Sequence, residues 1–286
     1  MTKDTLARRL RFAPPDPKEA EIIYPQDADL IQWAAISRHG PLPITYLHQF
    51  TERKNYPNLQ KRYTRFYHQG YVTRPPRQYA SFHARYSPLV YDLSPKAKTE
   101  LGTTACSLPP SRSAPFLHQL MQACFTASLE LLAPAEGMRF VSRDEVLAHP
   151  NATQKTLSLT LANTRLIPDD LFALERPDGK RRFFFLEIDR NTESIERHIG
   201  HYNTWSKKVA SYDEMFRRSL HEEAWGFPKA TVLTVTTNER HAENLEAFVK
   251  DRSAYPDRYA FAVEPAFAAN WRVPKELLNS AATILG

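Results

Sequence analysis

The sequence predicts an α/β protein of two domains, a small helical domain followed by a larger one built around a mixed β-sheet. Three observations support this prediction. The element patterns change from short helices and a hairpin to alternating strands and helices in the order αβββαβαβ. A segment rich in Pro, Ser and Thr, residues 103–115, separates the two parts. Residues 1–115 hold 17 Lys and Arg against 9 Asp and Glu, a balance of +8, whereas the remainder holds 21 against 23, a balance of −2.

The composition excludes several classes of protein. With 286 residues the chain can bury a sizeable core, and its eight glycines form no phosphate-binding loop. Its two cysteines, Cys106 and Cys124, have no metal-ligand spacing and imply no disulfide framework, which is typical of a cytoplasmic protein. No apolar stretch is long enough to cross a bilayer, so we expect no membrane partner.

A basic arm, residues 1–24, precedes three predicted helices. Residues 27–39 carry apolar side chains at helical spacing and end at Gly40. Residues 44–50 follow a "GPLP" turn and form a short second helix. The third, residues 58–69, has one apolar and one polar face.

Two strand patterns come next, "YVTR" and "PLVYDL", with a basic and aromatic loop between them. Three short helices and a hairpin are the order of a winged helix-turn-helix domain, which we assign to residues 25–102. Because the third helix of such a domain enters the major groove, we expect double-stranded DNA as the partner. The predicted DNA-binding residues are Gln60, Lys61, Thr64 and Arg65 on the helix and Arg74, Arg77 and Arg85 at the wing. A small helical domain with a basic surface and no nucleic acid is the alternative.

Residues 116–286 predict an α/β sandwich. Its expected helices are residues 116–133, 193–220 and 238–251, and its expected strands are residues 156–163, 166–175, 181–190, 229–237 and 258–263.

The "RPDGK" turn sets the register between the second and third of these strands. A three-residue loop Pro177-Asp178-Gly179, with Gly in the left-handed conformation, pairs Arg176 with Lys180. Asp169 then faces Glu187 directly, and Asp189 lies on the diagonal of the same face. A two-residue loop would shift the register by one residue and send Asp169 to the other face.

Two carboxylates at the end of so apolar a strand need an explanation, since burying a bare carboxylate is costly unless a cation meets it. Facing carboxylates are typical ligands of Mg²⁺ or Mn²⁺, so the pair Asp169 and Glu187 predicts a metal site. In the alternative, Asp169 serves only the turn after Pro168, and the strand ends in solvent.

The segments "LIPDDLFALE" and "RFFFLEIDRNTES", followed by a helix and "ATVLTVTTNERHAENL", resemble the replication-relaxation family of plasmid and mobile-element proteins. The second domain is also similar to the PD-(D/E)XK restriction-endonuclease-like superfamily, whose core has the order αβββαβ. The resemblance implies that Asp169 and Glu187 are catalytic metal-binding acids. It also implies an extra metal ligand at Glu130, on the helix before the sheet.

The chain departs from the nuclease pattern at the residue two positions after the glutamate, where Asp189 replaces a lysine. Asp189 remains a catalytic candidate, because an aspartate can ligate or orient a second metal ion. The missing positive charge could come from Arg190, or from Lys207 or Lys208 on the following helix. His198 and His201 are candidates for a base or a phosphate contact on that helix, with plain surface histidines as the alternative.

Three functions fit these expectations. The first is a DNA-binding protein of a plasmid or other mobile element that acts in replication, relaxation or mobilisation, with a metal-dependent nuclease as its second domain and other replication or mobilisation proteins as partners. The second is a non-catalytic DNA-binding factor whose nuclease-like domain binds partners or forms a homodimer. The third is a transcriptional regulator whose second domain senses a ligand. Metal binding would support the first function. An activity that is unchanged by Asp169→Ala and Glu187→Ala would support the second. A loss of DNA affinity when a ligand binds would support the third.

Overall fold

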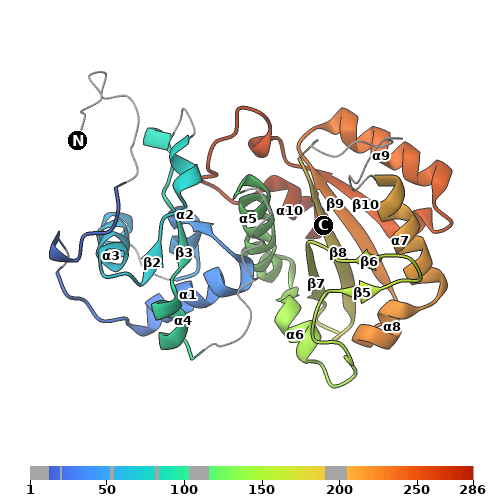
Figure 1. Cartoon of the computed structure of the whole chain (residues 1–286), viewed down its shortest axis with the longest axis horizontal. Coiled ribbons are helices and arrows are strands. Elements are labelled where there is room, and N and C mark those ends of the chain that lie inside the picture. The colour runs from blue at the N-terminus through green and yellow to red at the C-terminus, as the bar shows by residue number, and fades with distance from the viewer. Residues whose placement is uncertain are drawn as a thin grey trace. The chain divides into compact units, whose positions relative to one another are not determined.

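The computed structural model describes residues 13–19, 21–51, 55–80, 84–102, 116–190 and 205–285. It has the mixed α/β content that the sequence predicts (Figure 1). The chain divides into two compact units. Unit 1 comprises residues 1–131 and 269–278, and unit 2 comprises residues 132–268 and 279–286.

Unit 1 contains the three predicted helices and both predicted strands close to their expected bounds. Its elements are α1 (Asp27–His39), β1 (Leu42–Pro43), α2 (Ile44–Gln49), α3 (Tyr56–His68), β2 (Val72–Thr73), β3 (Val90–Leu93) and α4 (Pro95–Glu100), with the short 3₁₀ helices η1 (Pro17–Glu19), η2 (Pro76–Ala80) and η3 (Ala84–Tyr86). The three strands pair antiparallel in the order β1-β3-β2. The two-residue strand β1 was not predicted.

Aromatic packing explains how α3 is held. The helix begins where the Asn55 side chain accepts a hydrogen bond from the backbone N–H of Asn58, which caps its first turn. Its apolar face is buried, and Phe66 packs edge-on against Trp33 of α1 at 5.1 Å between ring centroids. The polar face of α3 therefore points outward, away from the core of unit 1.

Unit 1 also takes in α5 (Phe116–Leu132), as far as Leu131, and the returning segment 269–278. The predicted domains placed this helix with the sheet instead. Every residue from Leu120 to Leu129 is buried, so α5 has no exposed face there and its sequence does not indicate which unit it packs against. The Ser128 hydroxyl accepts a hydrogen bond from the backbone N–H of Leu278 at 3.0 Å, which ties the returning segment to α5.

Unit 2 is built on a five-stranded mixed sheet in the order β10-β9-β8-β7-β4. Its strands are β4 (Arg139–Val141), β7 (Asp170–Glu175), β8 (Arg181–Asp189), β9 (Ala230–Thr236) and β10 (Tyr259–Val263). The pairs β4·β7 and β7·β8 are antiparallel, whereas β8·β9 and β9·β10 are parallel. The predicted mixed sheet is therefore present.

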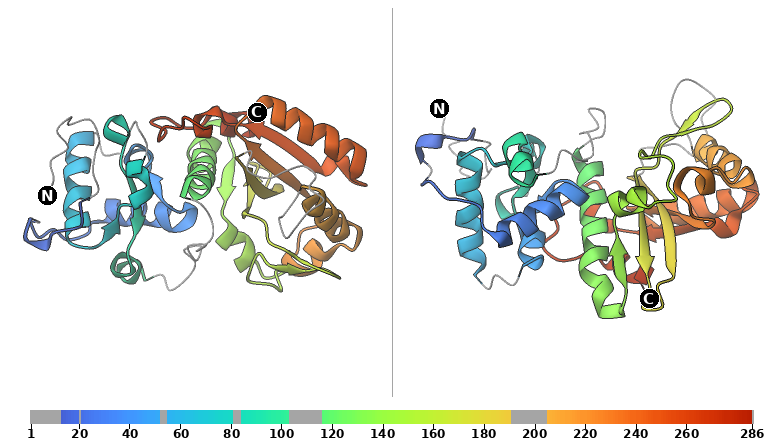
Figure 2. Two further views of the ribbon diagram at one scale, coloured as in Figure 1. Left: turned by 45° about the horizontal axis from the view of Figure 1, so that its top comes forward. Right: turned by 90° about the horizontal axis from the view of Figure 1, so that it is seen from below.

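Helices cover this sheet, as the views in Figure 2 show. The helices of unit 2 are α6 (Arg143–Ala148), α7 (Trp205–Arg217), α8 (Leu220–Trp225), α9 (Glu239–Arg252) and α10 (Asn279–Leu285), with the 3₁₀ helices η4 (Ala133–Glu136), η5 (Pro256–Arg258) and η6 (Pro265–Phe267). The main core joins one face of the sheet, including Phe185, to Tyr212 of α7 and Trp225 of α8. A smaller cluster joins Trp205 of α7 to Leu245 of α9. Helix α7 thus lies over the face of β8 that carries Phe185.

Two element predictions in unit 2 are wrong. Residues 156–163 do not form a strand of the main sheet, because only β5 (Leu159–Thr160) forms there and pairs with β6 (Arg165–Leu166) in a separate two-stranded sheet. The first strand of the main sheet is β4, which is too short for its alternation to be recognised. The predicted helix 193–220 is interrupted at Ser219, whose positive φ of 53° separates α7 from α8. Residues 191–204, with His198 and His201, lie outside the described residues.

The predicted turn between β7 and β8 is confirmed. Gly179 is in the left-handed region at φ 78°, and the backbone N–H of Arg176 donates to the carbonyl of Lys180 at 2.9 Å. The ladder then runs from Glu175 opposite Arg181 to Asp170 opposite Leu186. The register that places Asp169 next to Glu187 is therefore the one that the structure has.

Candidate functional site

The carboxyl end of β8 brings polar side chains from four elements onto one face of the sheet. Asp169, just before β7, is held by backbone contacts: its N–H donates to the carbonyl of Leu186 at 3.1 Å, and its Oδ2 accepts from the N–H of Ile188 at 2.8 Å. These contacts continue the β7·β8 register by one residue. They fix the Asp169 carboxylate beside that of Glu187.

Glu187 is almost completely buried, with 2% of its surface exposed. Its Oε1 accepts from the Tyr212 hydroxyl at 2.6 Å, and its Oε2 accepts from the Lys208 ammonium at 2.9 Å. Lys208 and Tyr212 are four residues apart on α7 and so share one face of the helix. Burial raises the pKa of Glu187, Lys208 opposes that rise, and the charge of Asp169 adds to it.

Of the residues that could supply the charge of the missing lysine, Lys208 has a contact with Glu187. The Lys208 side chain is 16% exposed, and its ammonium lies 2.9 Å from the carboxylate of Glu187. The guanidinium of Arg190, another sequence candidate, donates instead to the carbonyl of Phe267 at 3.3 Å. Lys207, the third candidate, is exposed. Among the described residues, Lys208 is therefore the candidate with a defined contact to the carboxylate pair.

Asp189 forms a second buried cluster on the same face, two residues beyond Glu187. Its Oδ2 accepts from Nε1 of Trp205 at 2.7 Å and from Nε2 of His241 at 2.8 Å. Sequence reasoning missed both donors. Two signals point to them: Trp205 lies three residues before Lys208 on α7, and His241 lies in the first turn of α9, just after the carboxyl end of β9. The carboxyl ends of parallel strands meet at one edge, so His241 comes next to Asp189.

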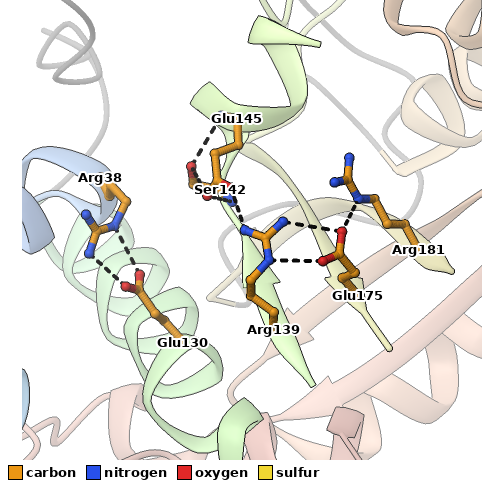
Figure 3. A network of polar contacts seen from close by, with 7 residues as sticks. All are labelled: Arg38, Glu130, Arg139, Ser142, Glu145, Glu175 and Arg181. Atoms are coloured by element: carbon orange, nitrogen blue, oxygen red, sulfur yellow. Dashed lines mark hydrogen bonds and ion pairs between the residues drawn. The ribbon is translucent and has the colours of Figure 1, made fainter. Parts of the chain in front are cut away.

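Glu130 has different partners. It lies in unit 1, where its carboxylate receives a bidentate pair from Arg38, at 2.7 and 3.1 Å (Figure 3). Nε2 of His39 donates to the same carboxylate at 2.7 Å. Burial works against ionisation, but His39 and then Arg38 outweigh it and lower the pKa of Glu130 from 4.5 to about 2. This carboxylate is already neutralised by two basic side chains, so we leave Glu130 out of the candidate metal site.

The side chains at the carboxyl end of β8 can be compared with the ligands that Mg²⁺ or Mn²⁺ requires. Among the described residues, no group of three or more His, Cys, Asp or Glu side chains is placed to hold a metal. The pair Asp169 and Glu187 nevertheless matches the way Mg²⁺ often binds, through one or two carboxylates with water and substrate phosphate as the other ligands. Because the charge of Asp169 raises the pKa of Glu187, a cation between them would relieve a repulsion. The pair therefore fits a metal bound largely by water and phosphate.

The predicted DNA-binding residues of unit 1 fall into two groups. The exposed or partly exposed ones are Gln60, Lys61 and Arg65 on α3, Arg77 on η2 and Arg85 on η3. Arg65 forms an ion pair with Glu21.

Arg74 and Thr64 form the other group: both are half-buried, and their side chains are hydrogen-bonded within unit 1. The guanidinium of Arg74 lies 4.2 Å from the ring centroid of Tyr67 and donates to the hydroxyls of Thr64 and Tyr91, at 3.1 Å each. These contacts join α3 to the hairpin. We therefore expect Arg74 and Thr64 to stabilise unit 1 rather than to contact a base.

Comparison with known proteins adds one match. A family model described as replication-relaxation matches residues 34–230, which is more than half of the chain and includes α2, α3 and the carboxylate pair. No curated protein and no solved structure matches the chain. Within the described residues, no helix is both long and apolar enough to cross a membrane.

Proposed function

Since the chain belongs to the replication-relaxation family, we propose that it is a DNA-binding protein of a plasmid or other mobile element, acting in replication, relaxation or mobilisation, and that unit 2 cleaves phosphodiester bonds with the help of a metal ion. One observation carries the proposal of cleavage. The Asp169 carboxylate, just before β7, lies beside that of Glu187 on β8, and the ammonium of Lys208 is 2.9 Å from Glu187.

DNA binding is supported by the elements of unit 1. The order α1, α2, α3, β2, β3, with β1 completing a three-stranded sheet, is that of a winged helix-turn-helix domain. Helix α3 would be the recognition helix, because its apolar face is buried and its polar face carries Gln60, Lys61 and Arg65. The basic balance of +8 over residues 1–115 favours a polyanionic partner.

A nuclease-like core in unit 2 is supported by its topology. The antiparallel strands β4, β7 and β8 are followed by α7 and by β9, which is parallel to β8. This order agrees with the βββαβ part of the PD-(D/E)XK core, with α6 and the β5·β6 pair inserted after β4. The acids lie just before β7 and within β8, which are the positions of the metal-binding acids of that superfamily.

Each side chain then has a role in cleavage. Asp169 and Glu187 would hold Mg²⁺ or Mn²⁺. When bound, such an ion polarises the phosphate and lowers the pKa of a water molecule. Lys208 would stabilise the negative charge that develops on the phosphate oxygens, which is the task of the missing lysine. Tyr212 fixes the orientation of the Glu187 carboxylate by donating to Oε1.

Asp189 would act through His241. Because Nε2 of His241 donates to Asp189, the other ring nitrogen, Nδ1, is left to exchange a proton with water or with the leaving oxygen. His241 is 15% exposed, so its ring reaches the surface of unit 2. Asp189 is in this account a positioning residue, which explains an aspartate where the nuclease pattern has a lysine.

A second function is favoured by the saturation of the buried acids. Both oxygens of Glu187 are already engaged by Tyr212 and Lys208, and Oδ2 of Asp189 accepts two bonds. A buried network satisfied in this way can also be purely structural. In that case the protein is a non-catalytic DNA-binding factor, and unit 2 binds partners.

Incubation of supercoiled and linear plasmid with the pure protein separates the two functions. Wild type is compared with Asp169→Asn, Glu187→Gln and an EDTA control, in Mg²⁺ and in Mn²⁺, with a mobility-shift assay on the same DNA. Cleavage that vanishes in both variants and in EDTA, while the shift remains, is the expected result. A wild type that shifts DNA without cutting it would establish the non-catalytic function.

A further inference from the structure

The edge of the unit 2 sheet opposite the carboxylates is basic. The strands β4, β8, β9 and β10 all run in the same direction, so their amino ends meet at this edge. Each of them starts with a basic residue or directly after one. We call this set the amino edge, and it consists of Arg139, Arg181, Arg182, Lys229 and Arg258. The near-neutral charge of the second half of the sequence conceals this concentration.

Four of these side chains surround one cavity. Arg181, Arg182, Lys229 and Arg258 line a hollow of about 350 Å³ together with the first residues of β9. No carboxylate is among its described lining residues. The hollow is large enough for a phosphate group with its sugar, and its lining gives it a positive potential.

The cations are held in place before any ligand arrives. Arg258 lies 5.5 Å from the ring centroid of Phe216 and its Nη1 donates to the carbonyl of Ala230 at 3.5 Å. Arg182 lies 4.8 Å from the ring centroid of Phe184. Ordering these long side chains in advance lowers the entropy lost on binding.

The acids near this edge do not cancel its charge. β7 ends at the edge with Glu175, which is shared by Arg181 at 2.5 Å and Arg139 at 3.1 Å (Figure 3). Arg139 also pairs with Glu145 of α6 at 2.6 Å. The two carboxylates therefore pair with two of the five cations, and no described ion pair engages Arg182, Lys229 or Arg258.

We propose that the amino edge of unit 2 binds the phosphodiester backbone of DNA, as a contact separate from both α3 and the carboxylate pair. The inference rests on the proposed function, because it takes DNA as the ligand. Arginine forks suit phosphate oxygens. Arg181, Lys229 and Arg258 lie at the amino ends of three neighbouring strands, which are about 4.8 Å apart, and all three line the same hollow, so one phosphate backbone crossing it would meet more than one cation.

The contact lies well away from the proposed chemistry. Glu187 is five residues further along β8 than Arg182, which corresponds to about 17 Å along an extended strand. Substitutions at the amino edge therefore leave the carboxylates intact. They change how DNA is held and not the groups that would cut it.

The test is the salt dependence of duplex binding by the full chain. The double variant Arg182→Gln, Lys229→Gln is compared with wild type and with a control, Arg218→Gln, Lys250→Gln. The control removes the same charge from unit 2 at side chains that pair with Glu214 and Glu246. Each phosphate contact contributes about 0.9 to the slope of log affinity against log salt. We expect the slope of the double variant to fall by about 2, with up to about 60-fold weaker binding at 0.1 M salt, and the control to match wild type.

Equal slopes for wild type and the double variant would overturn the inference while leaving DNA binding by unit 1 in place. If wild type bound no DNA at all, the proposed function and this inference would fail together. Poly-glutamate and inorganic phosphate are tested at the same ionic strength. Binding of poly-glutamate as tight as that of DNA, with the same loss in the double variant, would show a general polyanion surface and overturn the assignment to a phosphodiester backbone. Protection of the first residues of β8 and β9 from hydrogen exchange by DNA, lost in the variant, is the second expected result.

Discussion

Glu130 offers the most quantitative prediction, because its surroundings change its proton affinity strongly. Its pKa falls from 4.5 to about 2, and a tenfold change in proton affinity corresponds to about 1.4 kcal/mol. Ionised Glu130 therefore stabilises unit 1 by about 3 kcal/mol. Because the folded pKa lies below the unfolded one, this stabilisation is complete above pH 4.5 and is lost as the pH falls towards 2. The Glu130→Gln variant should lack it at neutral pH.

Urea unfolding at several pH values, followed by hydrogen exchange of peptides from α1 and α5, measures this effect in unit 1. Exchange is needed because a two-unit chain need not unfold in a single step. The free energies of wild type and Glu130→Gln should differ by about 3 kcal/mol at pH 7 and converge near pH 2. A difference below about 0.5 kcal/mol at pH 7, or one that does not depend on pH, would refute the role given to Arg38 and His39.

Three further predictions concern single residues. Burial raises the pKa of Glu187, so the folded state loses stability as the pH rises above 4.5. At pH 7 the Glu187→Gln variant should therefore lose cleavage, but its midpoint of urea unfolding should be no lower than that of wild type. A lower midpoint would contradict this prediction. Lys208→Gln should reduce the cleavage rate by about 10²–10³-fold without changing DNA affinity, and an equal loss of affinity would place Lys208 in binding instead. Arg74→Ala should destabilise unit 1 by about 2–3 kcal/mol, because it removes two hydrogen bonds and a cation–π contact. Unchanged stability with weaker DNA binding would instead show that Arg74 contacts DNA, as the sequence predicted.

Local signals in the sequence predicted much of this fold. The turn at Pro177 to Gly179 has a glycine where the backbone needs positive φ, and so it fixed the register of β7 and β8 and the neighbourhood of Asp169 and Glu187. Helices with one apolar face, such as α3, were predicted nearly to the residue. In both cases the determining interactions lie within a few residues of each other.

The features that the sequence did not predict are determined by packing between residues far apart in the chain. Strand β4 has three residues, too few to show alternation. Glu130 was separated by 91 and 92 residues from its partners His39 and Arg38, and His241 by 52 residues from Asp189. The sequence offered three basic residues that could replace the lysine of the nuclease pattern. Two of them, Lys207 and Lys208, are adjacent in the chain, and only the packing of α7 on the sheet distinguishes them. Each of these outcomes depends on which elements meet, and spacing along the chain does not encode that.

Binding of Mn²⁺, followed by electron paramagnetic resonance, tests most directly whether Asp169 and Glu187 form a metal site. Metal and proton compete for a carboxylate of raised pKa, so the affinity of wild type should increase as the pH rises. We expect one Mn²⁺ ion per wild-type chain, none in Asp169→Asn or Glu187→Gln, and one in the control variant Glu130→Gln. Equal Mn²⁺ binding by wild type and the two site variants would show that Asp169 and Glu187 do not form a metal site.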